Sequence, residues 1–232
     1  MLILGIDTCC MAATAAVIDD TKMIAQTVIN HKKTHSQKML PQIEQMLEMA
    51  EIDVCEIDCF AAAVGPGSFT GVRIGVATAK ALAQACGKPC VGVSTLEALA
   101  NNNAQFGGII CPILDARREQ VYNGLFRGIT MERLCDDRAL GIDELLDELE
   151  NFQEKVMFCG DGTLVFKEKI IEKLGEKAVF AQRMQNLNLG GSVAEIGYRE
   201  CQKGNTIFYG ELVPEYIRLS QAERERIEAE KK

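Results

Sequence analysis

Residues 64–80, VGPGSFTGVRIGVATAK, join a buried strand to a long helix through a glycine-rich turn. Gly65 and Gly67 allow backbone angles that a side chain would forbid, and Ser68 or Thr70 can cap the helix that follows. The free N–H groups of its first turn suit an anion or a partner's carboxylate. Because glycine-rich turns are common, the spacing alone favours a tight strand–helix connection without a ligand.

Small residues recur at every fourth position of this helix, at Gly71, Gly75, Ala79 and Ala83. They share one helix face, so another element can approach the helix backbone closely there. Glycine inside a helix costs about 1 kcal/mol relative to alanine, and two of them therefore indicate a close neighbour. That neighbour is either a part of the same chain or another subunit, and the sequence leaves both alternatives open.

The elements around this turn predict an α/β domain. Strands are expected at Leu2–Asp7, Ala12–Ile18, Met23–Ile29, Cys59–Val64 and Cys90–Val93, and helices at His35–Ala50, after Ser68 as far as Gly87, and at Ser94–Asn101. The order is a three-strand meander followed by helix, strand, helix, strand and helix. This order resembles the ribonuclease H-like fold.

The second half of the chain resembles a reduced copy of the first. Strands are expected at Ile109–Leu114, Gln120–Arg127, Ile129–Cys135 and Lys155–Cys159, and helices at Asp143–Glu150, Leu164–Leu174 and Ser192–Lys203. Two ribonuclease H-like domains side by side are the architecture of the actin/sugar kinase/Hsp70 (ASKHA) superfamily. We therefore predict a domain at 1–105, a smaller domain at 106–220, and a charged tail at 221–232.

Composition excludes several classes of function. The chain has 232 residues, 47% of them hydrophobic, and a formal net charge of −8 without a basic block. This balance argues against nucleic-acid binding by the chain alone. The sequence starts without a secretory leader and holds no apolar run long enough for a membrane span, so we expect a cytoplasmic protein. Its ten cysteines are expected to be reduced thiols, mostly in the core.

Polar residues at strand ends are candidates for a cleft between the two domains. Asp7 ends the first strand, where the superfamily carries an aspartate near the metal and phosphates of a nucleotide. The sequence continues as Thr-Cys-Cys without the usual glycine, so capping of local backbone groups is the alternative role. Asp115-Ala116-Arg117 could face the cleft opposite Asp7, or form a hairpin held by its own charges. The candidate nucleotide or cleft residues are Asp7, Gly65, Gly67, Ser68, Arg73, Asp115 and Arg117.

Two other patterns carry little chemistry. His31 and His35 are the only histidines, and without a third ligand we interpret them as surface residues near a helix start rather than a metal site. The turn Gly160-Asp161-Gly162-Thr163 could accept a nucleotide, but alone it is a weak signal. No Ser/His/Asp or Cys/His arrangement for nucleophilic catalysis can be assembled.

Several motifs occur in an order that spans nearly the whole chain. They are Leu4–Thr8, His35-Ser36 with Leu40-Pro41, Gly65–Ala81, Gly92–Leu96, Asp115–Arg117 with Val121-Tyr122, and Pro214–Arg218. With them the chain resembles the TsaB (YeaZ) family of glycoprotease-like proteins, also labelled peptidase M22 homologues. The resemblance implies a part in making N6-threonylcarbamoyladenosine at position 37 of tRNA.

The family resemblance also implies partners. TsaB-like proteins pair with the paralogue TsaD, which performs the transfer; a TsaE-like ATPase binds the pair, and a homodimer forms when TsaD is absent. We expect this chain to contact tRNA only as part of the complex. We also expect that the chain alone binds no cofactor, and that ATP or ADP binds at most at the junction of the complex. The implied partner interface comprises Met39, Ile43, Met46, Leu47, Gly71, Val72, Gly75 and Ala79.

The metal-binding histidines of the TsaD family have no counterpart here. The matching positions read Ser-Thr-Leu-Glu-Ala-Leu, so Thr95 and Leu99 replace the two ligands. The resemblance therefore implies a non-catalytic scaffold and argues against a peptidase. The alternative function is a nucleotide-hydrolysing or phosphotransferase enzyme that uses Asp7, Gly67 and Asp115 in the cleft.

Overall fold

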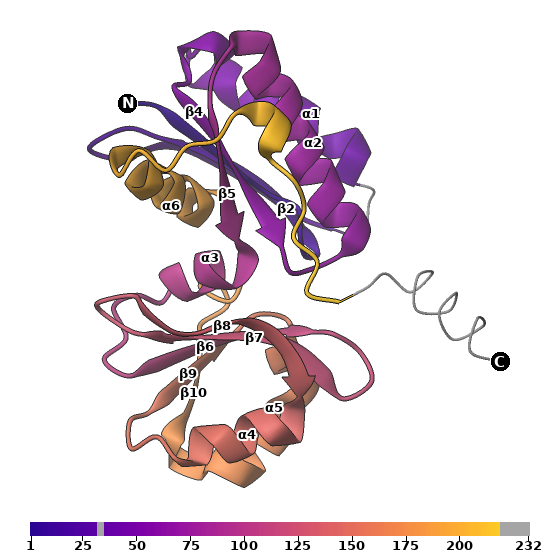
Figure 1. Cartoon of the computed structure of the whole chain (residues 1–232), viewed down its shortest axis with the longest axis vertical. Coiled ribbons are helices and arrows are strands. Elements are labelled where there is room, and N and C mark those ends of the chain that lie inside the picture. The colour runs from indigo at the N-terminus through magenta and orange to yellow at the C-terminus, as the bar shows by residue number, and fades with distance from the viewer. Residues whose placement is uncertain (32–34, 219–232) are drawn as a thin grey trace, which may run out of the picture.

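Short apolar strands and amphipathic helices assemble into two stacked α/β domains (Figure 1). The computed structural model describes residues 1–31 and 35–218. The predicted charged tail, 221–232, lies outside the described residues. No described helix is long and apolar enough to cross a membrane.

Five strands form the first sheet, in the order β3-β2-β1-β4-β5. They span Ile3–Asp7 (β1), Ala12–Ile18 (β2), Met23–Asn30 (β3), Cys59–Gly65 (β4) and Cys90–Ser94 (β5). The central strand β1 is antiparallel to β2 and parallel to β4. All three of these strands are buried along their whole length, which explains their continuous apolar sequences.

Helices α1 (His35–Met49) and α2 (Phe69–Cys86) cover one face of this sheet (Figure 1). The Ser68 hydroxyl caps α2 by accepting a hydrogen bond from the Gly71 N–H at 3.3 Å, and Gly87 ends it with a left-handed φ of +64°. Between α1 and β4 lies a single 3₁₀ turn, η1 (Val54–Glu56). After β5, the Ser94 hydroxyl caps the short helix α3 (Thr95–Asn101).

The second sheet repeats this arrangement in the order β10-β9-β6-β7-β8. Its strands are Ile109–Asp115 (β6), Gln120–Arg127 (β7), Glu132–Gly141 (β8), Val156–Cys159 (β9) and Ala178–Phe180 (β10). Helices α4 (Ile142–Glu150) and α5 (Gly162–Leu174) pack beside each other below it, and η2 (Gly175–Lys177) leads into β10. The copy is reduced at its parallel edge, where β9 and β10 have 4 and 3 residues.

The last helix of each half crosses to the other sheet. Helix α3 belongs in sequence to the first half, but Leu96, Leu99 and Ala100 share a buried cluster with residues of β6 and β7. Helix α6 (Gly190–Gln202) follows β10, yet it packs on β1, β2 and β4 of the first sheet, opposite α1 and α2 (Figure 1). The predicted division at 105 therefore separates each of these two helices from the sheet that it covers.

Two elements of the second half differ from the sequence prediction. The strand expected at Ile129–Cys135 runs instead at Glu132–Gly141, because Ile129 and Met131 adopt left-handed angles and form the preceding turn. The strand itself is rich in charged residues, so it lacked an apolar signal. The three-residue β10 was not predicted, since so short a strand carries no periodicity.

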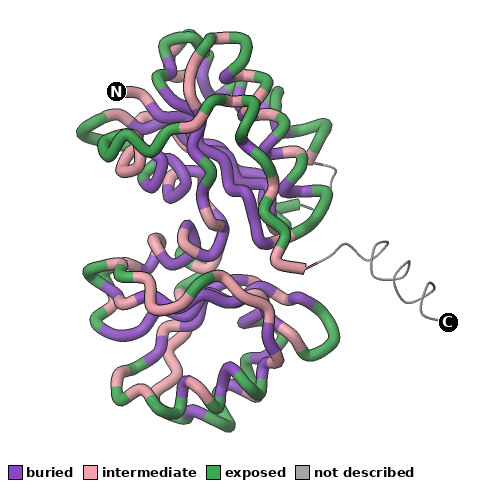
Figure 2. The backbone as a smooth tube through the Cα atoms, viewed as in Figure 1, coloured by how far each residue is buried: buried purple, intermediate pink, exposed green. Residues whose placement is uncertain are grey.

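Buried residues concentrate on the central strands of each sheet (Figure 2) and form three apolar clusters. A first cluster joins β1, β2 and β4 to α1, α2 and α6, and a second joins β6 and β7 to α4 and α5. The third cluster, around α3, lies between the two domains and includes Phe126 and Leu114. It therefore helps to set the position of the strand ends that face each other across the molecule.

Candidate functional site

The small-residue face of α2 packs against the protein's own central strand. A Cβ atom at Gly71 would collide with the Thr8 carbonyl oxygen, and one at Gly75 would lie 2.7 Å from the Thr8 hydroxyl oxygen. That hydroxyl donates a hydrogen bond of 2.6 Å to the Gly71 carbonyl. The close neighbour that the glycines indicate is therefore β1 and the residue after it, within the same chain. A leucine at Gly75 would disturb the fold of the single chain and not an interface alone.

The side chains assigned to the partner interface also point inward. Six of them are at most 6% exposed, and the two glycines are buried. The eight residues are Met39, Ile43, Met46, Leu47, Gly71, Val72, Gly75 and Ala79. Because these residues are buried within the single chain, a partner that approached the same two helices would meet their exposed neighbours first. Leu40 and Met49, for example, are 54% and 81% exposed.

A cavity of about 500 Å³ lies between the ends of the two central strands. Its walls come from the loop after β1, the start of α1, the glycine-rich turn, the β6–β7 hairpin and the turn before α5. Predicted cleft residues among them are Gly67, Ser68, Asp115 and Arg117. Ala116 and Tyr122 of the same predicted hairpin also line it, as does Asp161 of the turn considered for a nucleotide. The lining residues that the sequence did not assign to the cleft are Cys9, Cys10, Met11, His35 and Leu114.

Asp7 lies beneath this cavity and not in its wall. Alternation along β1 turns residues 3, 5 and 7 towards α6, and the Asp7 side chain is 0% exposed there. Its Oδ1 accepts a hydrogen bond from the Cys9 N–H at 2.7 Å, and its Oδ2 accepts one from the Asn188 amide at 2.9 Å. Burial raises the pKa of Asp7, while these two bonds oppose that shift. The carboxylate therefore holds local structure, the alternative role that the sequence left open.

The Asp115–Arg117 hairpin does face the cavity, and its charges pair with each other. Arg117 forms a 3.0 Å ion pair with Asp115, whose Oδ1 also accepts the Arg117 N–H at 2.8 Å. Arg117, Arg118 and Glu119 all have left-handed φ angles between 55° and 65°. The Asp115 N–H donates in turn to Asp161 at 3.0 Å, and burial raises the pKa of Asp161. Both of the sequence alternatives for this hairpin therefore apply.

Gly65 and Arg73 lie outside the cavity, where they hold a C-terminal strap, residues 212–218. A Cβ at Gly65 would be 2.5 Å from the Glu215 carbonyl oxygen, and Gly65 has a φ of +123° that favours glycine. The Arg73 guanidinium lies 3.9 Å from the Phe69 ring centroid and donates to the Tyr216 hydroxyl at 2.7 Å. The strap ends with Arg218 donating to the Ala116 carbonyl at 2.7 Å, which ties the first domain to the hairpin.

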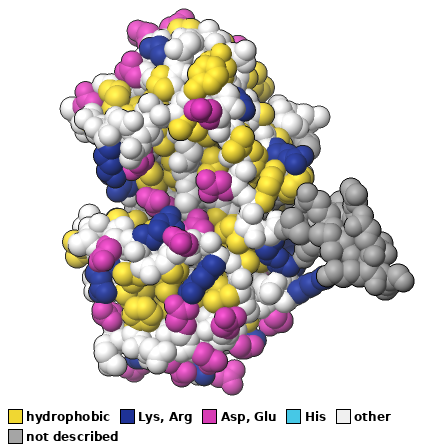
Figure 3. Space-filling view, in the orientation of Figure 1, with side chains coloured by type: hydrophobic (Ala, Val, Ile, Leu, Met, Phe, Trp, Pro, Cys, Tyr) yellow, Lys and Arg dark blue, Asp and Glu magenta, His cyan; other side chains and the backbone are white. Residues whose placement is uncertain are grey.

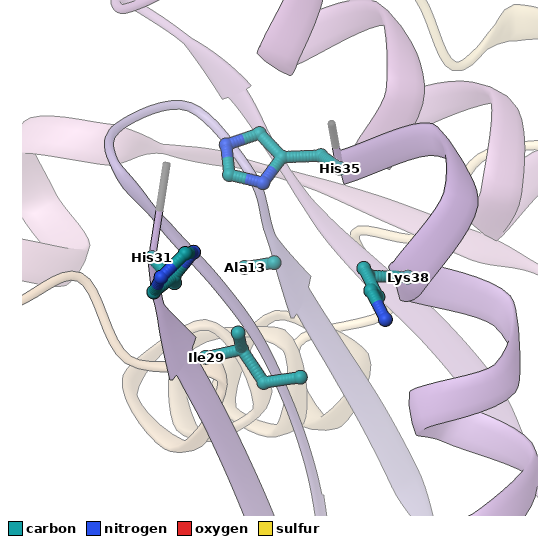
Figure 4. Close-up of a pocket in the computed structure, with 5 residues that line it drawn as sticks. All are labelled: Ala13, Ile29, His31, His35 and Lys38. Carbon is teal, nitrogen blue, oxygen red and sulfur yellow. The ribbon is translucent and has the colours of Figure 1, made fainter. Parts of the chain in front are cut away.

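The two histidines border a second, smaller hollow (Figure 4). His31 is exposed, whereas His35 starts α1 and its Nε2 lies 2.9 Å from the Cys10 carbonyl oxygen. Figure 4 shows His31 at the end of the strand that carries Ile29, and His35 at the start of the helix that carries Lys38. Within residues 1–31 and 35–218, no cluster of three or more His, Cys, Asp or Glu side chains could hold a metal ion.

The residues around the cavity do not fit a nucleotide phosphate in the manner of a kinase. The glycine-rich turn packs tightly against the loop after β1. The Ser68 N–H donates to the Cys9 carbonyl oxygen at 2.7 Å, and a Cβ at Gly67 would lie 2.5 Å from that same oxygen. The Asp7 carboxylate is sealed below by Asn188. No hydrolytic step is therefore assigned to the cleft.

Comparison with known proteins identifies the family. A family model described as TsaD, tRNA N6-adenosine threonylcarbamoyltransferase, matches residues 22–226. The tRNA threonylcarbamoyladenosine biosynthesis protein TsaB of Bacillus subtilis (strain 168) is 35% identical over 233 residues, which cover 100% of both chains.

Two solved structures share the fold. YeaZ from Pseudomonas aeruginosa superposes with a TM-score of 0.76 at 22% identity, covering 93% of this chain and 99% of that chain. The ROK hexokinase from Thermus thermophilus reaches a TM-score of 0.52 at 13% identity, covering 88% and 100%. The predicted ASKHA-type fold is thereby confirmed. With 35% identity over its full length and a matching family model, the chain belongs to the TsaB family, within the wider group of TsaD-like proteins.

Proposed function

We propose that this protein takes part in the biosynthesis of N6-threonylcarbamoyladenosine in tRNA, as a subunit that pairs with a TsaD-like transferase and does not itself catalyse the transfer. The observation that carries the proposal is the full-length similarity to the B. subtilis biosynthesis protein. Because the match covers both chains completely, it includes both domains and the strap that joins them.

The non-catalytic role is supported by what fills the key positions. Thr95 and Leu99, which replace the metal-binding histidines of the transferase family, are both 0% exposed on α3. Leu99 is part of the apolar cluster between the domains. The Asp7 carboxylate likewise accepts hydrogen bonds from the Cys9 N–H and the Asn188 amide. Leu99 serves packing and Asp7 serves local hydrogen bonds, which leaves chemistry to the partner.

The surface we assign to the partner is the groove between α1 and α2. It has a volume of about 410 Å³, and its apolar floor includes Leu40, Val54 and Leu82. Glu44, Glu48 and Asp53 border the same groove. An apolar centre with an acidic rim suits a partner surface that presents apolar side chains flanked by Lys or Arg.

The charge of the chain supports contact with tRNA through the partner only. On the face shown in Figure 3, acidic side chains gather at the second-domain end, over α4. Helix α4 carries five acidic residues in nine, and three cations, Lys169 and Lys173 of α5 and Arg138 of β8, balance part of this charge. Such a surface repels phosphates.

The test measures complex formation and tRNA modification together. Size-exclusion chromatography with light scattering is run on the protein, on TsaD from the same genome, and on their mixture, and modified nucleosides are then quantified by mass spectrometry. We expect a 1:1 complex, with modification only when both proteins are present. A mixture that stays separate, or full modification by TsaD alone, would reject the proposal.

A matched pair of variants locates the surface. Leu40→Asp places a charge in the groove, and Leu164→Asp places the same charge on α5, where Leu164 is 80% exposed. Loss of the complex with the first variant and retention with the second is the expected pattern. Equal behaviour of the two would remove the groove from the interface.

A further inference from the structure

Two cysteine side chains from distant parts of the sequence meet at one end of the first domain. Cys55 lies in the middle of η1, and Cys86 is the last residue of α2. Their Sγ atoms are 2.7 Å apart, across a sequence separation of 31 residues. That distance is only about 0.7 Å longer than a disulfide bond. The two sulfur atoms therefore need little movement to become bonded.

The backbone on each side of the pair is held in place. The Asp53 carboxylate accepts the Cys55 N–H at 2.8 Å, and the Glu56 carboxylate accepts the Asp53 N–H at 2.7 Å, which together form a capping box. On the other side, the Gly87 N–H closes the end of α2 on the Ala83 and Gln84 carbonyls. The two thiols are thus brought together by ordered elements and not by a chance contact of loose loops.

Access distinguishes Cys55 from the other cysteines. Cys55 is exposed, whereas Cys86 is half-buried, as are Cys10, Cys135 and Cys201, and the remaining five cysteines are buried. Burial, followed by the hydrogen bond with Cys55, raises the pKa of Cys86 to about 11. Cys86 therefore stays protonated near neutral pH, and the exposed Cys55 is the sulfur that meets a reagent from solution first.

We propose that Cys55 and Cys86 form a redox-active dithiol, a modification site that a hydroperoxide converts into a reversible disulfide. The Cys55 sulfur attacks one peroxide oxygen, the O–O bond breaks, and a sulfenic acid and one water result. The Cys86 sulfur then attacks the sulfenic sulfur, the S–O bond breaks, and a second water leaves. The two thiols lose two electrons to hydrogen peroxide, and a small dithiol such as dithiothreitol returns them.

The disulfide would join η1 to the end of α2 beside the groove that Val54 and Leu82 line. Closing a loop of about 31 residues restricts the unfolded chain and raises the Tm by about 10 °C. The inference does not depend on the proposed function, because both of its readouts, the cross-linked peptide and the Tm, are measured on this protein alone.

The experiment treats the full-length protein with a small excess of hydrogen peroxide and digests it without reduction. We expect a peptide that links Cys55 to Cys86, and a rise in Tm that dithiothreitol reverses. Cys55→Ser and Cys86→Ser should abolish both. As the matched control, Cys201→Ser removes a partner from the other hydrogen-bonded cysteine pair, Cys59 and Cys201, and should leave both unchanged.

Three results would overturn the inference: no linked peptide, a linked peptide that joins other cysteines, or an undiminished Tm rise in Cys55→Ser. Cys55 is exposed, so this variant folds even if the half-buried Cys86 does not tolerate serine.

Discussion

Helices α3 and α6 hold equivalent places in the two halves of the chain, and each covers the sheet of the other half, but they dock by different means. Helix α6 approaches β1 and β4 closely through glycines, since a Cβ at Gly5 of β1 would collide with the Gly190 carbonyl and one at Gly197 would lie 2.5 Å from the Cβ of Ala61 on β4. Helix α3 instead inserts Leu96 and Leu99 into an apolar cluster. The two domains are therefore interlocked, and the contact made through glycines tolerates less change.

The same contrast appears in the aspartates that end the two central strands. Asp7, at the end of β1, is fully buried and held by Asn188, which precedes α6. Asp115, at the end of β6, faces the cavity and pairs with Arg117, which is 87% exposed. The end of β1 is thus covered by Asn188, just before α6, whereas the end of β6 is open to the cavity.

The largest effect is expected where α6 touches the sheet through glycine. Gly197→Leu should lower the free energy of unfolding by about 4 kcal/mol or more, because the side chain has no space against Ala61. Urea denaturation measures this. Glu195→Leu, on the exposed face of the same helix, should stay within about 0.5 kcal/mol of wild type. Similar values for both variants would mean that α6 is not docked as described.

A cavity made in the apolar cluster around α3 should lower the free energy of unfolding by less than Gly197→Leu does. Leu99→Ala removes three carbons from a fully buried site between the domains and should cost about 3 kcal/mol in the same measurement. Leu164→Ala, at an 80% exposed position, serves as the control and should be nearly neutral. A loss below 1 kcal/mol at Leu99 would argue that the two domains do not share this core.

Breaking the seal on the first strand end should have a smaller, pH-dependent effect. Asn188→Ala leaves the Asp7 carboxylate without one of its two hydrogen bonds and should cost about 2 kcal/mol at neutral pH. Burial raises the pKa of Asp7 in the folded state above its pKa in the unfolded state, so protonation of Asp7 favours folding. The stability that this provides is complete below the unfolded-state pKa and is lost as the pH rises through the folded-state pKa. Because Asn188 stabilises the ionised form, the cost of the variant should grow with pH across that window. A cost independent of pH would contradict the assigned contact.

The smallest effect is expected at the open strand end. Arg117→Ala removes an ion pair whose cation is 87% exposed, and should change the unfolding free energy by less than about 1 kcal/mol. The difference between Arg117→Ala and wild type should shrink further in 1 M salt, where surface charges are screened. A loss of unfolding free energy as large as that in Asn188→Ala would mean that the ends of β1 and β6 do not differ as described.

Local sequence predicted most of the elements, since periodicity and capping residues are local signals. The strand at Ala12–Ile18 and the helix that begins at His35 match the structure, and Ser68 and Ser94 cap the helices that follow them. Errors gathered where the local signal was weak, as at the charged β8 and the three-residue β10.

The cleft was predicted in part for a similar reason. Gly67, Ser68, Asp115 and Arg117 stand at strand ends or turns, which the chain order already places at one edge of each sheet. Gly65 and Arg73 adjoin the same turn in sequence, but the strap, about 140 residues further along the chain, occupies them. No nearby residue signals that contact.

Residue types and short spacings were enough to predict most of the strands and helices in their order, the glycine face of α2 and the family to which the chain belongs. Three features became visible only in the folded chain: the contact of the glycine face, the sheets that α3 and α6 cover, and the hydrogen bond from Asn188 to Asp7, 181 positions away. Burial and hydrogen bonding depend on which surfaces meet in space, and these surfaces come from segments that lie far apart along the chain.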